Sequence, residues 1–383
     1  MNIKDFFFKK QETVTEKITP MISEYSTPFL KVGQGDLSLP YVRAYSHSEP
    51  YVRFGEDNLF SQLVNQMYHS SPLNSGIINF KTNAVIGGGY TLESITKTAK
   101  EKVAEYTFLK RIKFDKLSKQ LTQDLVMHER VCLLICTKNG TKHIKRLSPE
   151  TVRINYHKNI VTVCEDWSRN VNMCSYPVYN PAIKEDSVYY YEVEGIAGQS
   201  IYPIPSYCSA LNWCFVDGQM SYLMKSNLVN SIFPSFMLTL AKKFESDDEM
   251  RAFKETVEKA KGASEAGKIL TFVSEFTENL PTITAIAQNN NDSLFIETVT
   301  NLEMNICRAH QIDPIIMGIR VGGKLGSGAE LPVAYNIFMK NVIYPLRGEM
   351  EDIFNDIMMI GNFASSIKIN DFRIVDDGVT QTK

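Results

Sequence analysis

The sequence predicts a protein of the α+β class, with helices around a small sheet. Apolar residues recur at helical spacing in the first and last thirds of the 383-residue chain, whereas short strand-forming runs separated by turn signals occupy the middle third. The composition, 44% hydrophobic and 22% charged, is that of a globular protein, which excludes wholesale disorder, collagen and a coiled-coil rod. At about 150 residues per domain, we expect two to three domains.

The N-terminal segment, residues 1–50, is interrupted by prolines and lacks a clear period, so we expect an arm with little regular structure. It begins MNIKDFFFKK, which holds only three consecutive apolar residues and does not resemble a secretory signal. No apolar run in the chain approaches the ~18 residues of a membrane span. We therefore expect synthesis inside the cell and no membrane partner.

Three helices are expected next. The first covers Glu56–His69. The second has Ser71 as its N-cap and Pro72 at its first position, and it ends at Gly87 and the two glycines that follow. The third carries an apolar stripe formed by Phe114, Leu117, Leu121, Leu125 and Val126.

Strand candidates follow in the middle third. Val131–Thr137 is an apolar run that ends at the turn-forming pair Asn139-Gly140, which predicts a hairpin. Further strand candidates are Val152–Tyr156, Ile160–Cys164 and Val188–Val193. We therefore expect a small mixed or antiparallel sheet.

Two long helices are predicted at 215–233 and 293–310. Between them we expect a charged helix over Asp247–Lys261 and a strand over Ile269–Val273. Two helices with an insertion between them bury little apolar surface alone, so we expect neighbouring copies of the chain to cover them. His310 ends the second helix, where a cation would interact favourably with the last carbonyls.

The remaining part of the chain is predicted as a glycine-rich loop, a helix and a short strand. The loop covers 313–330, and the helix runs from Glu330 to about Ile360. Pro345 lies inside this helix, and we expect it to produce a kink. The residues SIKINDFRIV alternate in polarity as one short strand.

The charges are balanced, with 41 Lys and Arg against 43 Asp and Glu and a formal net charge of −2. A nucleic-acid-binding domain would carry a clear excess of basic residues, so any DNA contact is expected to be local. Basic residues cluster at 110–119 and 138–146. The first cluster is placed on a helix whose other face is apolar, and a solvated face is its simplest interpretation.

The nearest sequence to a catalytic motif is Gly318–Lys324, which fits GxxxxGK. Leu325 stands where a phosphate-binding loop needs Ser or Thr to ligate magnesium, and Pro332 interrupts the helix that should follow. A nucleotide-binding enzyme that uses this loop is an alternative. The favoured interpretation is a glycine loop whose backbone is free to change conformation and whose cations are Arg320 and Lys324.

No metal, cofactor or catalytic residue is indicated. The seven cysteines contain no CxxC pair, and the six histidines contain no HxxxH or HExxH pattern. The odd number of cysteines and the apolar runs around several of them favour buried free thiols in a reducing compartment.

Taken in order, the elements resemble those of a compact tailed-bacteriophage portal protein. FGEDNLF before SPLNSGIINFKTNAVIGGG resembles the start of the portal wing, and DLVMHERVCLLICTKNG with IKRLSPETVRI resembles its sheet. YPIPSY and LVNSIFPSF resemble the two ends of the first stem helix. ICRAHQIDPIIMGI and ELPVAYNIFMKNVIYPLRGEMEDIFNDI resemble the second stem helix and the long wing helix. The similarity covers residues 50–360, and the 23 residues beyond leave room only for a minimal crown.

The resemblance implies a portal fold with a definite division of the chain. The expected parts are an N-terminal arm at 1–50, a wing of helices and a small sheet at 51–214, stem helix 1 at 215–234, a small αβ clip at 235–288, stem helix 2 at 289–312, a tunnel loop at 313–330, a long kinked wing helix at 331–360 and a short C-terminal strand or minimal crown at 361–383.

The resemblance also implies a protein without catalytic activity. Portal proteins form a dodecameric ring at one capsid vertex, and double-stranded DNA passes through this ring while a separate terminase hydrolyses ATP. The expected partners are further copies of the chain, the DNA, the terminase large subunit, the major capsid protein and head–tail adaptor proteins. The expected location is the virion, after synthesis in the cytoplasm of a bacterial host. Another phage head–tail adaptor or scaffold protein is an alternative.

The resemblance assigns two groups of residues. The tunnel loop would face the DNA through Arg320 and Lys324 and through the glycines Gly322, Gly323, Gly326 and Gly328. The clip would face the terminase and the adaptors through Asp247, Glu249, Arg251, Lys254, Glu258 and Lys261. Near-neutral charge suits a channel, because many phosphate contacts would hold the DNA rather than let it pass.

Overall fold

The computed structural model describes residues 50–55, 57–93, 98–138, 141–194, 201–230, 236–239, 282–285, 291–319 and 330–371, with the single positions 248, 251 and 255. The chain divides into two units, Met1–Asp36 and Leu37–Lys383, and every described residue belongs to the second. The predicted N-terminal arm lies outside the described residues up to position 49.

The first two helices are α1, Phe60–Ser70, and α2, Pro72–Ile86. The predicted N-cap of α2 is confirmed, because Ser71 Oγ accepts a hydrogen bond from the Asn74 amide at 3.2 Å. The predicted C-terminus is also confirmed at Gly87, whose φ of 59° lies in the region that glycine tolerates. Helix α1 begins four residues later than predicted, because Asn58 adopts a left-handed conformation and its side chain accepts from the Phe54 amide.

The next helical segment is two helices, α3 (Ala99–Arg111) and α4 (Phe114–His128). The apolar stripe predicted for α4 is buried. The placement of the basic cluster on one helix is wrong. Lys110 and Arg111 end α3, and Lys113 adopts a left-handed conformation (φ 53°) that separates the two helices.

The predicted small sheet is two antiparallel sheets of three strands each. The first has the order β3-β2-β7 and consists of β2, Arg130–Lys138, β3, Thr141–Leu147, and β7, Ser187–Glu192. The second has the order β4-β5-β6 and consists of β4, Val152–Ile154, β5, Ile160–Val163, and β6, Cys174–Pro177. Lys138 pairs with Thr141 across the β2–β3 hairpin, as the Asn139-Gly140 signal predicts.

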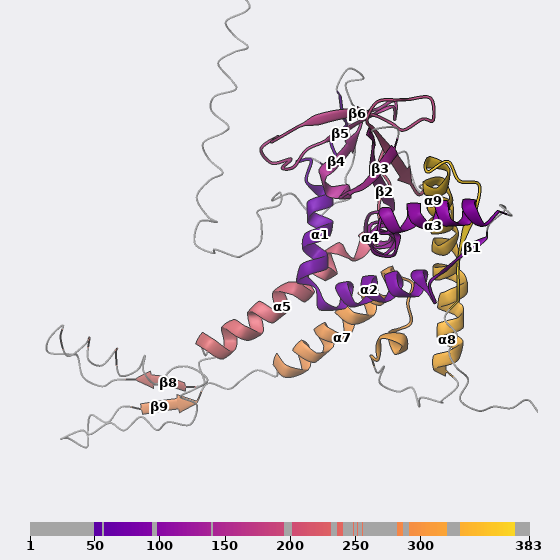
Figure 1. Ribbon diagram of the computed structural model, residues 1–383. Helices are drawn as coiled ribbons and strands as arrows, with labels where there is room; N and C mark the ends of the chain where they lie inside the picture. Colours follow the sequence, from indigo (N-terminus) through magenta and orange to yellow (C-terminus); the bar gives the residue numbers. More distant parts are fainter. Residues whose placement is uncertain are drawn as a thin grey trace, which may run out of the picture. The chain divides into compact units, whose positions relative to one another are not determined.

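Two helices follow the sheets, α5 over Leu211–Asn230 and α7 over Asn291–Ala309. They pack against each other, and both contact α2 (Figure 1). The segment between them contains an antiparallel pair, β8 (Phe236–Thr239) with β9 (Thr282–Ala285). The strand predicted at 269–273 lies outside the described residues, and of the charged helix only positions 248, 251 and 255 are described, all helical and exposed.

The predicted long helix is described in three parts: α8, Glu330–Phe338, a π-helical turn at Met339–Ile343, and α9, Tyr344–Ile360. Pro345 is exposed and stands in the first turn of α9. Because proline has no amide N–H to donate and its ring would crowd the carbonyl four residues back, a wider turn just before it relieves the conflict.

The last strand, β10, Ser366–Ile369, covers the start of the tail that the sequence predicts as a strand. It pairs antiparallel with β1, Tyr90–Glu93. The core lies around α4, which packs on α2, on α9 and on the inner strand β2. At its centre, the Phe114 ring packs edge-on against both Tyr90 and Phe354, at centroid distances of 4.9 Å.

Candidate assembly surface and its supports

Most of the predicted site residues lie outside the described residues. These are Arg320, Gly322, Gly323, Lys324, Gly326 and Gly328 of the tunnel loop and Asp247, Glu249, Lys254, Glu258 and Lys261 of the clip. Arg251 is helical and exposed. The roles predicted for these residues stay predictions. The described part of the chain instead presents two exposed apolar helix faces and the polar contacts that hold them.

The first of these contacts fixes α5 against the start of α2. Asp217 on α5 accepts hydrogen bonds from Ser71 Oγ at 2.5 Å and from the Leu73 amide at 3.3 Å. A carboxylate in this position also interacts favourably with the positive end of the α2 dipole. Gly218 allows the close approach, because a Cβ there would stand 3.0 Å from Ser70 Cβ.

A second contact fixes the end of α7 to α2 through His310. This side chain is 1% exposed, its Nε2 donates to Asn74 Oδ1 at 2.9 Å, and its ring stacks on Tyr207 at 4.5 Å. Burial, together with nearby Lys81, holds the pKa of His310 well below its usual value. The sequence-based interpretation of His310 as a capping cation is therefore wrong, because the buried ring is neutral.

Two further ionisable groups are buried at the same junction. Burial lowers the pKa of Lys81 on α2 to about 8, although the carboxylate of Glu129 opposes this change. Burial likewise raises the pKa of Glu129, whose Oε1 accepts from the Ser206 amide at 2.6 Å. These groups lie where α2, the end of α4 and the segment before α5 meet.

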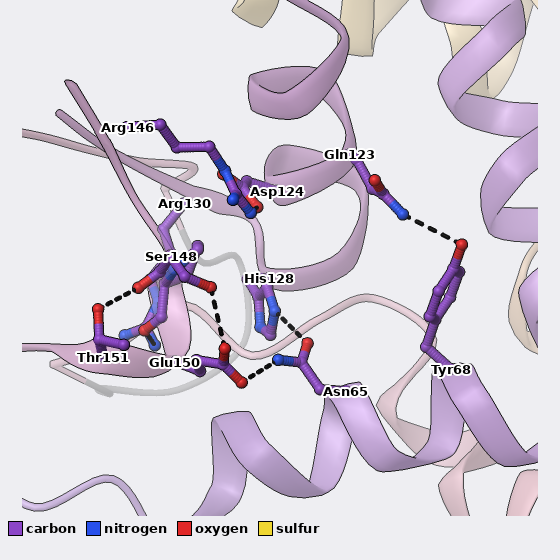
Figure 2. A network of polar contacts seen from close by, with 11 residues as sticks. Asn65, Tyr68, Gln123, Asp124, His128, Arg130, Arg146, Ser148, Glu150 and Thr151 are labelled. Atoms are coloured by element: carbon purple, nitrogen blue, oxygen red, sulfur yellow. Dashed lines mark hydrogen bonds and ion pairs between the residues drawn. The ribbon is translucent and has the colours of Figure 1, made fainter. Parts of the chain in front are cut away.

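Behind the junction, a polar network connects α1 and α4 to the sheets (Figure 2). Asn65 lies between two partners, since its Nδ2 donates to Glu150 and its Oδ1 accepts from His128 Nε2 at 3.0 Å. Burial and the neighbouring arginines hold the pKa of His128 well below its usual value, so the ring is a neutral donor. Arg146 donates twice to Asp124, both times at 2.5 Å. Burial nevertheless raises the pKa of Asp124 to about 6.

Two apolar faces remain exposed on the described helices. The α5 face consists of Phe215, Val216, Tyr222, Leu223 and Met224, which are 37–49% exposed. The α8 face consists of Val333 and Ile337, which are 56% and 55% exposed; Leu331 at the start of α8 and Tyr344 at the start of α9 are also exposed. The sequence predicted that the helix now described as α5 would need covering by neighbours. The α8 face was missed, although Val333 and Ile337 stand four residues apart, which is the spacing of one helix face.

The described part of the chain contains neither a candidate metal site nor a candidate membrane span. Within it, no three His, Cys, Asp or Glu side chains lie close enough to hold a metal ion. No described helix is both long and apolar enough to cross a bilayer. The seven cysteines are free thiols; Cys174 is exposed, in contrast to the predicted burial.

No protein-family model and no curated protein matches this sequence. Solved structures do match. A chain in the virion of a native gene transfer agent particle has a TM-score of 0.55 at 12% identity, over 81% of this chain and 83% of that one. A chain in the neck of the native particle, computed with C12 symmetry, gives 0.55 at 13% identity over the same shares. An HK97-family phage portal protein from Corynebacterium diphtheriae gives 0.47 at 14% identity, over 82% of this chain and 98% of that one.

The two matches at 0.55 show a shared fold over most of the chain. The fold is therefore that of a mixed helix-and-sheet protein, and it is shared with a chain of the gene transfer agent particle. This fold agrees with the resemblance to tailed-phage portal proteins that the sequence indicated.

Proposed function

We propose that this protein is a portal protein, which forms a ring at one vertex of a phage capsid or a related particle and conducts double-stranded DNA. The observation that carries the proposal is the fold shared over 81% of the chain with a protein from a neck of C12 symmetry. The proposed role is structural, since portal proteins leave ATP hydrolysis to a separate terminase.

The exposed apolar faces support a ring. The residues of α5 from Ser221 to Lys225 are all exposed, and five large apolar residues of this helix lie at its surface: Phe215, Val216, Tyr222, Leu223 and Met224. Water-exposed apolar area of this kind is unfavourable by about 25 cal/mol per Å², so covering it by a second copy stabilises the assembly.

The proposed parts of the chain follow the portal architecture. In this proposal α5 and α7 are the stem helices, and the residues between them form the clip that docks the terminase large subunit and later the head–tail adaptors. The two sheets with α1–α4 and α9 form the wing, which faces the major capsid protein. Pro345 and the π-helical turn before it mark the kink of the long wing helix.

The proposed DNA contact is confined to the tunnel loop, with Arg320 and Lys324 as its cations. A net charge of −2 for the whole chain supports weak rather than extended contact with phosphates. The protein would act within the virion, having been made in the bacterial host cytoplasm.

The test is the mass and symmetry of the purified protein. We expect a ring of twelve copies of the 43.5 kDa chain, about 520 kDa, with a central hole visible in cryo-electron micrographs. Mass photometry across nanomolar to micromolar concentrations provides an independent measurement. A single species of 43.5 kDa at every concentration would contradict the proposal.

A further inference from the structure

We propose that the interior of the protein binds water molecules between β2 and β7, and that this water connects the guanidinium of Arg130 with the carboxylate of Glu192 and the hydroxyl of Tyr190. The site is thus a solvent-bridged ion pair inside the protein. It is independent of the proposed function, because it concerns contacts within a single chain.

The first observation is that the buried side chain of Arg130 donates from only one of its three nitrogens. Its Nη2 donates to Ser61 Oγ at 2.7 Å and to the Pro149 carbonyl at 2.6 Å. Its Nε and Nη1 are buried and have no partner among the described residues. Since a guanidinium carries five N–H groups, three of those on Arg130 lack an acceptor within the described part of the chain.

The other buried arginine, Arg153, shows that this fold can satisfy a guanidinium completely. All three of its nitrogens donate, and the acceptors are the Asn58, Glu150 and Val152 carbonyls and the side-chain oxygens of Asn58 and Gln62. A buried charged donor without an acceptor costs more than an unpaired neutral one. The unpaired side of Arg130 therefore requires an acceptor, and the comparison with Arg153 makes it specific to this position.

The register of the sheet places two more unpaired atoms on the same side. Arg130 stands directly opposite Glu192, and Cys132 stands directly opposite Tyr190. Residues opposite each other in an antiparallel pair, and residues two apart on one strand, share a face of the sheet. Glu192 Oε2 and the Tyr190 hydroxyl are both buried without a partner in the described chain.

The two oxygens of Glu192 are in different surroundings. Lys158, which is exposed, donates to Oε1, whereas Oε2 is buried. Burial raises the pKa of Tyr190 well above its ordinary value, the charge of Arg130 opposes this change, and the carboxylate of Glu192 adds to it. Both charged groups are therefore within electrostatic reach of the Tyr190 hydroxyl.

Water suits this set of atoms better than an anion does. The set combines N–H donors with a carboxylate oxygen, and a water molecule can accept from the donors and donate to the carboxylate. An anion can only accept, and Glu192 would repel it. Nε–H and the Nη1 hydrogens point in different directions from a rigid guanidinium, so one acceptor cannot serve both. A buried water makes about three hydrogen bonds, and the set provides enough partners for two.

The direct test is a map of the purified full-length protein, in any assembly, at a resolution that shows ordered water. We expect solvent peaks about 2.7–3.2 Å from Arg130 Nε and Nη1, with at least one peak equally close to Glu192 Oε2 or the Tyr190 hydroxyl. Direct contact between the Arg130 and Glu192 side chains would overturn the proposal, as would a map without such peaks. An anomalous peak there in crystals grown with sodium bromide would identify an anion instead and would also overturn it.

A double-mutant cycle in solution gives a second test with mild substitutions. Tyr190→Phe and Glu192→Met each remove one partner of the water, so we expect the combined loss in urea unfolding to be smaller than the sum of the two single losses. Tyr189→Phe is the matched control, because Tyr189 is on the other face of the same strand and its hydroxyl already donates to Asp356 at 2.7 Å. Its loss should add to that of Glu192→Met. Additive losses for Tyr190→Phe and Glu192→Met would show that no water connects the two side chains.

Discussion

Two arginines, Arg130 and Arg153, are completely buried, and no described carboxylate forms a salt bridge with either. Arg130 donates to Ser61 Oγ and to the Pro149 carbonyl, and its guanidinium lies 5.1 Å from the Phe54 ring centroid. Arg153 lies 4.9 Å from the Trp167 ring, and burial lowers its pKa to about 9. A guanidinium is weakly hydrated and planar, so carbonyls and aromatic rings can hold it in the interior.

The ion pair of Asp124 with Arg146 gives a pH-dependent prediction. Arg146→Met leaves the Asp124 side chain, 4% exposed, without its partner. We expect a loss of about 3 kcal/mol of unfolding free energy at pH 7.5, because a buried charge is then uncompensated. At pH 5 the loss should be smaller, since the carboxyl, whose pKa burial raises to about 6 in the parent, is then protonated.

Urea unfolding at both pH values measures the effect. Lys145→Met, an exposed residue on the same strand, is the control and should change little at either pH. An equal loss for Arg146→Met at pH 7.5 and pH 5 would contradict the assignment of the effect to the Asp124 charge.

The buried histidines predict loss of stability in acid. The pKa values of His128 and His310 in the folded protein lie well below 6.5, so the unfolded chain binds more protons and stability falls as the pH decreases below 6.5. Each should cost about 1.4 kcal/mol at pH 5.5 relative to pH 7.5. The raised pKa of Asp124 acts in the opposite direction below pH 6.

Comparison with the double variant His128→Gln/His310→Gln isolates the histidine effect, because Asp124 contributes equally to both proteins. Chemical denaturation at pH 7.5, 6.5 and 5.5 and at one protein concentration should show a flatter profile for the variant. His143→Gln, at an exposed position, should keep the parental profile. Identical pH profiles for parent and double variant would refute the burial argument.

At the scale of elements, α2 is the piece on which the others are assembled. The start of α2 binds Asp217 of α5 and His310, which directly follows α7. The Ala84 and Val85 carbonyls of its last turn accept hydrogen bonds from Arg347 of α9. Among the described contacts, α5 and α7 are each held to the start of α2 near one end. A movement of α2 would therefore act on α5 and α7 together.

The glycine that ends α2 provides a matched pair of substitutions. Gly87 has φ 59°, and a Cβ there would stand 2.3 Å from the Asn370 carbonyl oxygen. We expect Gly87→Ala to cost about 2–4 kcal/mol through strain and displacement of the β10 end. Gly348→Ala on α9, where nothing lies within 4 Å of the new Cβ, should instead stabilise by about 0.5–1 kcal/mol. The melting temperature should fall for Gly87→Ala and rise for Gly348→Ala. Shifts of both variants in the same direction would contradict the prediction.

At the scale of the whole molecule, the chain combines a net charge of only −2 with exposed apolar residues on described helices. In the proposed portal, the first property suits a channel and the second suits an assembly. The division of the chain into arm, wing, stem, clip and tunnel loop is a proposal that a structure of the assembled ring would test residue by residue.

The tunnel loop gives the whole-molecule prediction. The double variant Arg320→Ala/Lys324→Ala should assemble into rings of parental mass but package or retain DNA differently, because its two cations per copy are the proposed phosphate contacts. Lys110→Ala/Arg111→Ala, with the same loss of charge at exposed positions of α3, is the control. If packaging and retention of DNA stay normal without both loop cations, Arg320 and Lys324 do not contact the DNA. The proposed ring would be unaffected by that result.

The sequence by itself determined the elements whose signals are local. Ser71 and Gly87 set the limits of α2, the stripe from Phe114 to Val126 set α4, and Asn139-Gly140 set the β2–β3 hairpin. The sequence also predicted that the helix now described as α5 carries apolar surface for neighbouring copies to cover. Each of these follows from caps, turns and periodicity within about fifteen residues.

Only the tertiary structure decided the features that depend on distant residues. Helix α3 was missed because Val103 and Tyr106 face outward while Glu105 is buried against Ser365, the reverse of an amphipathic pattern. The pairing of β1 with β10 joins segments far apart in the chain. The sequence predicted His310 as a cation at the end of a helix. In the fold its pKa is lowered by burial and by Lys81, which another helix brings close, so the ring is neutral.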